Sequence, residues 1–224
     1  MQEVIVFVEG QSEEQFIKRV IAPVFHQQQI FLKPSMLNTS KNAKGGALSF
    51  ERFKFNAKNT LKQNPQAVLT SFFDLYQLDT GFPSFDIAKQ YSDVYQRVDV
   101  LEKSLHQEII SVVGCRSERF IPYIQPYELE GLWFSDIEEL VQVEPSWKDS
   151  FLRLKRVREA FPTPEHINDG YETKPSKRLE DALSPKFKKT LHTVPIAERV
   201  TLAKIEAECL HFKAWMDKIR SIGD

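Results

Sequence analysis

The chain has 224 residues, of which 42% are hydrophobic and 12% aromatic. This supplies one sizeable core and gives no reason to expect two, so we expect a single globular unit. Lys and Arg number 30 against 31 acidic residues, which excludes a global basic attraction for nucleic acid. The two cysteines, Cys115 and Cys209, lie far apart, so neither a disulfide framework nor a thiolate zinc site is expected.

Charge is unevenly distributed along the chain. Residues 1–150 carry 15 basic and 20 acidic side chains, whereas residues 151–224 carry 15 basic and 11 acidic ones, giving net charges of −5 and +4. Such a division can set a carboxylate site beside a cationic, anion-binding surface, although ordinary variation among solvated faces would produce it equally well.

The first residues lack a basic segment, include Glu3, and contain an apolar run of only five residues, Val4 to Val8. Neither a signal peptide nor a membrane span is therefore expected. The cytoplasm is the expected location.

Segments typical of strands and segments with helical spacing succeed one another along the first 140 residues. In chain order they are a strand over 3–8, a helix from Ser12, a strand over 30–37, a polar loop over 38–46, a helix over 49–62, a strand over 66–73, helices over 85–106 and 107–113, a strand over 119–125, and a helical region over 129–140. From Trp147 the pattern is mostly helical, interrupted by the polar stretch 168–177.

Apolar strands separated by helices predict an α/β fold with a central, mostly parallel sheet covered by helices on both faces. Ligands of such sheets bind outside the carboxyl ends of the strands. We expect residues 1–145 to form this core and residues 146–224 to form a helical C-terminal extension packed on it.

Three carboxylates are expected at neighbouring strand ends. Glu9 follows the first strand, Glu13 lies four residues later near the start of the first helix, and Asp74 closes the third strand. A hard oxygen-donor set suits Mg²⁺ or Mn²⁺ rather than zinc, which indicates phosphate chemistry. Taken singly, each acid is better explained as part of a solvated helix N-terminus or as a cap, but an acid at the end of each of two apolar strands argues against coincidence.

Glu128 and Glu130 follow the fourth strand and lie two residues apart. In an extended segment they share a face, whereas in a helix they diverge by about 200°. We expect one of them at the site and the other capping or paired. The alternative is that both only support the apolar cluster that contains Leu132, Trp133 and Phe134.

Cations that would contact phosphate are expected in two places. Lys174, Lys177 and Arg178 are interrupted by Pro175 and predict a compact cationic loop. A second candidate is the loop that contains Lys41 and Lys44, before Gly45-Gly46, which lacks the spacing of a P-loop and gives no support for ATP hydrolysis. A solvated surface would explain the first group equally well.

The sequence also resembles a known family. Val8-Glu9-Gly10-Gln11-Ser12-Glu13-Glu14, followed by Phe16, is similar to the opening of Toprim-fold proteins, especially a Toprim-like family of small bacterial proteins of unknown function often encoded beside an ATPase. Further matches follow in order: Gly45-Gly46, Phe73-Asp74-Leu75-Tyr76 with Gly81-Phe82-Pro83, Ile121-Pro122-Tyr123-Ile124-Gln125 with Tyr127-Glu128-Leu129-Glu130-Gly131-Leu132, Pro164-Glu165-His166-Ile167-Asn168 with Pro175-Ser176-Lys177-Arg178-Leu179, and Cys209 with Phe212 and Trp215.

The resemblance implies a Toprim-like Rossmannoid core and metal-dependent phosphoryl transfer, as in topoisomerases, bacterial primases and nucleases of the overcoming-lysogenization-defect type. By resemblance, Glu9 takes the place of the Glu after the first strand and Asp74 that of the first Asp of an Asp-x-Asp pair, with Glu13 as a further metal ligand. The second Asp is replaced by Tyr76, a poor Mg²⁺ ligand, unless Glu128 or Glu130 supplies that carboxylate.

The resulting hypothesis is a nuclease that hydrolyses phosphodiester bonds of DNA or RNA, with Mg²⁺ or Mn²⁺ held by Glu9, Glu13, Asp74 and Glu128. Its catalytic residues would be Glu9, Glu13, Asp74, Glu130 and Lys177, and its nucleic-acid contacts Lys174, Lys177, Arg178, Lys41 and Lys44. The resemblance implies an antiphage effector partnered by an AAA/ABC-type ATPase, with homodimer formation left open and no membrane partner. The alternative is a catalytically silent Toprim-fold subunit that regulates or binds an ATPase.

Overall fold

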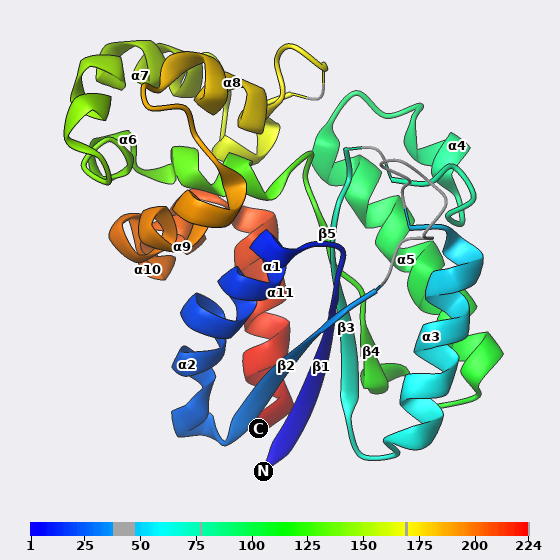
Figure 1. Ribbon diagram of the computed structural model, residues 1–224. Helices are drawn as coiled ribbons and strands as arrows, with labels where there is room; N and C mark the ends of the chain where they lie inside the picture. The colour runs from blue at the N-terminus through cyan, green and yellow to red at the C-terminus, as the bar shows by residue number, and fades with distance from the viewer. Residues whose placement is uncertain (38–47, 77, 169, 224) are drawn as a thin grey trace.

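The computed structural model describes residues 1–37, 48–76, 78–168 and 170–223, and the site lies within these ranges. A parallel sheet forms the centre (Figure 1). Its strands are β1 (Gln2–Val8), β2 (Ile30–Met36), β3 (Val68–Asp74), β4 (Phe120–Ile121) and β5 (Ile124–Gln125). The order is β2-β1-β3-β4, and β5 pairs with β3 beyond β4. The predicted α/β fold with a central parallel sheet is therefore confirmed.

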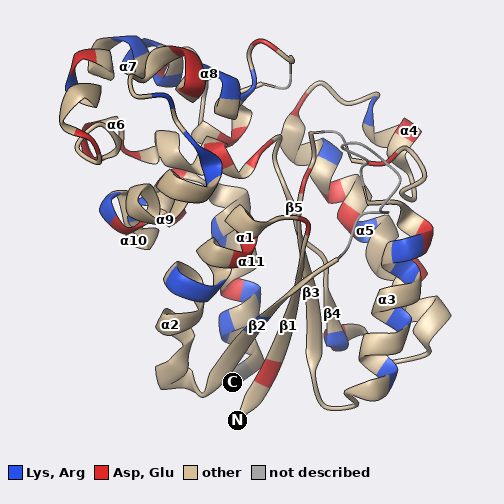
Figure 2. Ribbon diagram, in the orientation of Figure 1, with Lys and Arg blue, Asp and Glu red and all other residues tan. Residues whose placement is uncertain are grey.

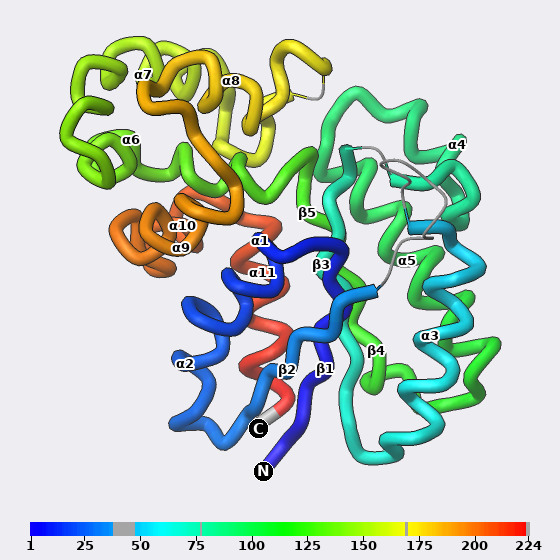
Figure 3. Tube along the Cα trace, viewed as in Figure 1, coloured from blue at the N-terminus to red at the C-terminus, as the bar shows by residue number. Residues whose placement is uncertain are grey.

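Helices cover both faces of this sheet. Alternate residues of the central strands point to opposite sides, and both sides are apolar and need to be buried. Val4, Val6 and Val8 of β1 belong to one buried cluster, whereas Ile5 and Phe7 belong to another. The first cluster is covered by α1 (Gln11–Phe16), the π-helical turn Ile17–Ile21, α2 (Ala22–Phe25) and α11 (Leu210–Arg220). The second is covered by α3 (Phe50–Gln63) and α5 (Val94–Val113), on the opposite side of the sheet in Figures 1 and 3.

The C-terminal third is helical, as expected. After α6 (Ile137–Leu140), it contains α7 (Phe151–Glu159), α8 (Pro175–Ala182), α9 (Lys189–Val200) and α10 (Leu202–Glu208), followed by α11. Helix α11 lies on the sheet itself, and Trp215 donates its indole N–H to Thr70 Oγ1 of β3 at 2.9 Å. The end of the chain thereby completes the core that the first strands begin.

The predicted fourth strand is divided in two. Pro122 has no N–H to donate, and the next residue, Tyr123, bonds to a side chain instead of the sheet. Tyr123 N donates to Ser71 Oγ at 3.0 Å, and Ser71 Oγ lies 3.0 Å from Tyr123 O. The chain then rejoins β3 as β5, one step closer to its carboxyl end.

The helical stretch expected over 85–106 and 107–113 also differs in its boundaries. A short helix, α4 (Phe85–Ala88), precedes an unbroken α5 of 20 residues. The Asp93 side chain accepts from Gln96 N at 3.0 Å as the N-cap of α5. Gly114 ends the helix with φ +70°, a left-handed conformation that glycine adopts without strain. In the described part of the chain, no helix combines the length and apolar character needed to cross a membrane.

Candidate metal centre

Asp74 is the last residue of β3, at the carboxyl edge of the sheet. The parallel pairing of β3 with β5 continues just beyond it, where Leu75 N donates to Gln125 O at 2.9 Å and Tyr76 N donates to Tyr127 O at 2.8 Å. These bonds hold the segment after β5 against the end of β3. Asp74 Oδ1 then accepts from Leu129 N at 2.9 Å, which fixes the carboxylate toward residues 128–130.

Glu128 and Glu130 join Asp74 in a compact acidic triad. One carboxylate oxygen from each of the three residues lies within 4.8 Å of the others. The backbone at Glu128 is extended, and Glu130 lies in the 3-10 helical segment Leu129–Ser135. This change of conformation turns both carboxylates inward, with exposed fractions of 2% and 0%. Sequence spacing alone left open which of the two would reach the site, and the structure brings both to Asp74.

Glu9 and Glu13 lie outside this triad; Glu13 acts on it electrostatically, and Glu9 interacts with Glu13. Glu9 directly follows β1, and Glu13 lies in α1 with only 9% exposure. A Cβ atom on Gly10 would lie 2.7 Å from Glu13 Oε2, so the absence of a side chain at Gly10 leaves room for the Glu13 carboxylate. Glu13 is among the causes that raise the pKa of Asp74, which places it beside the triad.

Two lysines from the C-terminal third enter the same region. Lys189, the first residue of α9, has its Nζ 2.9 Å from Glu130 Oε2 and 3.7 Å from Glu128 Oε1. Lys174 Nζ lies 2.9 Å from Glu128 Oε1 and 4.5 Å from the centre of the Tyr76 ring. Figure 2 shows these acidic and basic segments meeting between the sheet and the C-terminal helices.

Burial makes several carboxylates of the cluster poor acids. Desolvation, followed by repulsion from Glu13, raises the pKa of Glu9 to about 7. Desolvation also raises the pKa of Glu130 to about 7, although Lys189 opposes the shift. The pKa of Asp74 is raised well above its usual value by the same burial and by neighbouring carboxylates. Burial is the largest cause of all three shifts, so without a bound cation these carboxyl groups hold their protons more tightly than exposed acids do.

Glu128 and Lys189 shift in the opposite sense, each despite its burial. Desolvation alone would raise the pKa of Glu128, but Lys189, Lys174 and the Ser176 hydrogen bonds hold it below its usual value. Ser176 contributes its backbone N–H at 2.9 Å and its hydroxyl at 3.1 Å. Burial would lower the pKa of Lys189, yet Glu130, Asp74 and Glu128 raise it. Lys189 is therefore a fixed positive charge within the cluster.

The prediction that Lys174, Lys177 and Arg178 form a loop is wrong. Pro175 begins helix α8, since its fixed φ suits the first helical turn, and Lys177 and Arg178 lie on that helix. Lys177 Nζ pairs with Asp181 one turn later, at 2.8 Å. Of the three expected phosphate contacts, Lys174 is the one whose ammonium contacts the acidic cluster, through Glu128.

Arg178 contacts the chain segment that precedes α8. Its guanidinium donates to Thr173 O and to Asn168 Oδ1, the latter at 3.3 Å, and lies over the Phe161 ring. These contacts tie the segment before α8 to the helix. Lys41 and Lys44, the other expected phosphate contacts, lie outside the described residues.

The donor chemistry of the triad fits a hard divalent cation. Asp74, Glu128 and Glu130 offer only oxygen ligands, the type preferred by Mg²⁺ and Mn²⁺. Glu130 Oε1 is fully buried and has no hydrogen-bond partner. A buried carboxylate oxygen without a partner costs free energy unless a cation or donor satisfies it. The orphan oxygen is thus a second indication, independent of the clustering, that the site takes a cation.

Lys189 is the member of this site that the sequence did not reveal. It lies far from the acids along the chain and belongs to no recognisable motif. The available signal was the net charge of +4 over residues 151–224, which marks a region but selects no residue within it.

The fold and the site define an α/β protein with a lysine-bridged acidic centre at the carboxyl edge of a parallel sheet. The chain belongs to the family described as domain of unknown function DUF4276, whose model matches residues 8–220. No curated protein and no solved structure matches the chain.

Proposed function

We propose that the protein is a divalent-metal-dependent nuclease that hydrolyses phosphodiester bonds of DNA or RNA. The observation that carries the proposal is the triad of Asp74, Glu128 and Glu130, in which both glutamates are buried and Glu130 Oε1 has no partner. The three carboxylates and the neighbouring Glu13 outnumber the two lysines, Lys174 and Lys189, that contact the cluster. Removing such charges from water costs several kcal/mol per ion, which a bound cation and a substrate phosphate contact would offset.

The residues that would hold the metal are Asp74, Glu128 and Glu130, with Glu9 and Glu13 beside them. When bound, Mg²⁺ or Mn²⁺ would supply Lewis-acid polarisation of the phosphate and lower the pKa of water. Lys189 and Lys174 would position the phosphate and stabilise the charge that develops on its oxygens. The raised pKa of Lys189 assigns it this electrostatic role rather than that of a proton donor.

Glu9 suits the role of general base. It directly follows β1 at the carboxyl edge of the sheet, and burial and repulsion from Glu13 raise its pKa, which makes it a stronger proton acceptor than an exposed carboxylate. In hydrolysis, the Glu9 carboxylate would take the proton of the attacking water as the new P–O bond forms. The bond from phosphorus to the leaving oxygen then breaks, and that oxygen is protonated from solvent.

The wider role follows from the resemblance to Toprim-like proteins. On that basis the chain would be the nuclease effector of an antiphage defence system and would work with an AAA/ABC-type ATPase. Glu128 and Glu130 would compensate for the missing second Asp at Tyr76, because both carboxylates lie within 4.8 Å of an Asp74 oxygen.

A specific observation favours a second candidate, the catalytically silent Toprim-fold subunit. Lys189 already lies 2.9 Å from Glu130 Oε2, so an ammonium neutralises part of the charge that a metal would otherwise neutralise. In that case the acids and Lys189 form a buried ion cluster that maintains the fold. The two candidates differ in whether the cluster binds a metal ion and cleaves a substrate.

The test combines metal binding with cleavage. Crystals soaked in Mn²⁺ should show anomalous density at the triad, at ligand distances of roughly 2.0–2.6 Å. The purified chain, with and without its ATPase partner, should cleave DNA or RNA in Mn²⁺ and not in chelator. Asp74→Asn should reduce cleavage by on the order of 10³-fold, the scale of losing a key charge-stabilising group. Asp149→Asn, at an exposed position, is the matched control. A cluster that binds no Mn²⁺, together with no cleavage by the purified chain, would favour the silent subunit. Full activity of Asp74→Asn would instead show that cleavage does not take place at this triad.

A further inference from the structure

A cavity of about 270 Å³ adjoins the acidic centre. Leu75 and Tyr76, which directly follow Asp74, form part of its wall, as does Tyr127, which directly precedes Glu128. The backbone bond from Tyr76 N to Tyr127 O, at 2.8 Å, joins these two segments. The cavity and the acidic triad are therefore built on the same pair of chain segments.

Tyr76 connects the two sites. Lys174 Nζ lies 4.5 Å from the centre of the Tyr76 ring and 2.9 Å from Glu128 Oε1. A phosphate held near Lys174 would thus have the cavity as its immediate neighbour.

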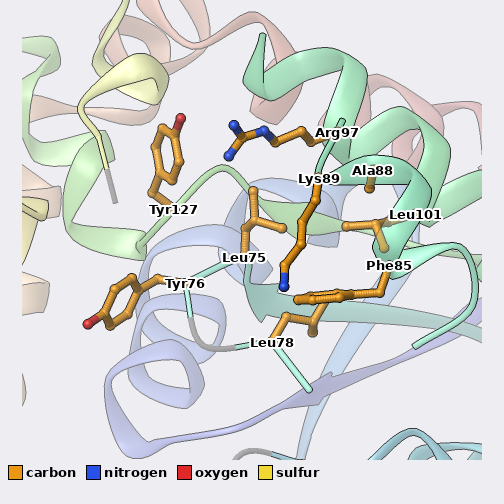
Figure 4. A pocket seen from close by; sticks show the side chains of 9 residues that line it. All are labelled: Leu75, Tyr76, Leu78, Phe85, Ala88, Lys89, Arg97, Leu101 and Tyr127. Atoms are coloured by element: carbon orange, nitrogen blue, oxygen red, sulfur yellow. The ribbon is translucent and has the colours of Figure 1, made fainter. Parts of the chain in front are cut away.

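The walls combine aromatic rings, an aliphatic floor and cations. Figure 4 shows Tyr76 and Tyr127 on one side, Phe85 with Lys89 on the other, and Leu75 between them. Lys89 Nζ lies 4.5 Å from the centre of the Phe85 ring. Arg97 Nε donates to Tyr91 O at 2.7 Å, and its guanidinium extends toward Tyr127 in Figure 4. Aromatic faces beside cations are the features that bind a nucleobase and the phosphate attached to it.

Tyr127 adopts an unusual backbone conformation at this position, with φ +56°. A bulky residue in the left-handed region is strained, and such strain occurs at sites where it directs a side chain. Here it allows Tyr127 to line the cavity while the next residue, Glu128, turns into the acidic triad.

We propose that this cavity binds one unstacked nucleobase of a single-stranded nucleic acid, next to the phosphate held at the acidic centre. The inference rests on the proposed nuclease function and specifies its substrate as single-stranded. A cavity of about 270 Å³ lies below the usual range for small-molecule sites, roughly 300–1,000 Å³. From this small volume we infer that the cavity holds one base and not two stacked bases. A base inside a duplex would have to leave its stack to enter.

The experiment compares a fluorescent single strand with the duplex of the same sequence. Dissociation constants are measured by anisotropy, with Ca²⁺ replacing Mg²⁺ to limit cleavage. The variant Phe85→Ala/Lys89→Ala removes one ring and one cation from the cavity. The matched control, Phe55→Ala/Lys62→Ala, removes the same residue types from exposed positions on α3.

The cavity variant should weaken single-strand binding about tenfold, as expected from the loss of one base-stacking contact. Duplex binding should change less than twofold, and the control should match the wild type for both ligands. Equal loss for strand and duplex, or no loss for the strand, would overturn the proposal. A nucleoside monophosphate that binds as tightly as the strand would also overturn it, since the ligand would then be a free nucleotide.

A second measurement uses the unaltered protein, because Phe85 is half-buried and its replacement can perturb folding. A strand carrying one 5-iodouracil should crosslink on irradiation to Tyr76, Phe85 or Tyr127. Crosslinks confined to other residues would count against the cavity.

The two proposals fail separately. Strand-specific binding without any metal-dependent cleavage would remove the nuclease and leave the cavity as a binding site. Cleavage that depends on Asp74, together with unchanged binding by the cavity variant, would remove the cavity and leave the nuclease.

Discussion

The described residues include two groups of buried carboxylates, and the groups are built differently. In the first, Glu165 and Glu102 connect α5, β5 and α11. Glu165 Oε1 accepts from Phe212 N at 3.0 Å, and its Oε2 lies 2.7 Å from the Tyr95 hydroxyl. Glu102 Oε1 accepts from Ile124 N at 2.8 Å and lies 2.8 Å from His211 Nε2. Both oxygens of Glu165 have partners, as is usual for buried acids that stabilise a fold.

The acidic centre lacks this complete pairing. Glu130 Oε1 is buried without a partner. Burial raises the pKa of Glu165 as it does those of Glu9 and Glu130, so the missing partner, and not the direction of the pKa shift, distinguishes the two groups. The difference separates two roles of a buried acid. Where donors satisfy every oxygen, the carboxylate maintains the structure. Where like charges remain crowded and an oxygen is orphaned, the protein retains unfavourable groups that a ligand would stabilise.

Replacing one acid in each group should change the free energy of unfolding very differently, and the change at Glu165 is the largest that we expect. Glu165→Gln puts an amide N–H₂ where donors now meet a carboxylate, so we expect the free energy of unfolding to fall by about 3 kcal/mol. Asp74→Asn loses the hydrogen bond from Leu129 N in part but relieves repulsion, so stability should change by less than about 1 kcal/mol or rise. Urea denaturation in chelator measures both, and equal destabilisation would show that the groups do not differ.

A smaller effect should appear in the pH dependence of Glu9→Gln. The pKa of Glu9 is about 7 in the folded state and near 4.5 when unfolded, so the folded protein binds the proton more tightly. Its destabilising effect is therefore absent below about pH 4.5, grows as pH rises, and is complete above about pH 7.

In chelator, Glu9→Gln should accordingly be more stable than the wild type by about 1 to 2 kcal/mol at pH 8, with no gain at pH 4.5. The measurement is a thermal or urea melt across this range. Glu51→Gln, at an exposed position, should show no such dependence. A gain that is the same at every pH would mean that ionisation of the buried Glu9 carboxyl is not its cause.

Local sequence patterns predicted the frame of the site but not all of its members. Glu9 and Asp74 could be placed because each follows an apolar strand, and parallel strands end at one edge of a sheet. The positions of Glu128 and Glu130 depended on where β5 ends and a 3-10 segment begins, which spacing does not determine. Lys189 was missed because only the tertiary packing of α9 brings it to the acids.

The lysines of the C-terminal third also differ in role, since one contacts the acidic centre and another pairs on the protein surface. The sequence grouped Lys174 with Lys177, but Lys174 contacts Glu128 at the centre, whereas Lys177 pairs with Asp181 on the surface of α8. Replacing Lys174, Lys177 and Arg178 together by Ala should weaken nucleic-acid binding. It should also reduce the salt dependence of binding, because fewer phosphate contacts form and fewer counterions are released. Arg178 also anchors the segment before α8, so the triple variant mixes binding with folding.

The single change Lys177→Ala isolates the binding effect and is the smallest that we expect. If Lys177 exchanges Asp181 for a phosphate when nucleic acid binds, its removal should reduce the slope of log K against log salt by about 0.7 for a single strand. Lys103→Ala is the matched control, because Lys103 pairs with Asp99 at the same spacing on a different helix, α5. Binding is measured at several salt concentrations, and the control slope should equal that of the wild type. An unchanged slope for Lys177→Ala would assign this lysine to the surface of α8 alone and leave Lys174, which directly precedes that helix, as the cation that meets the substrate.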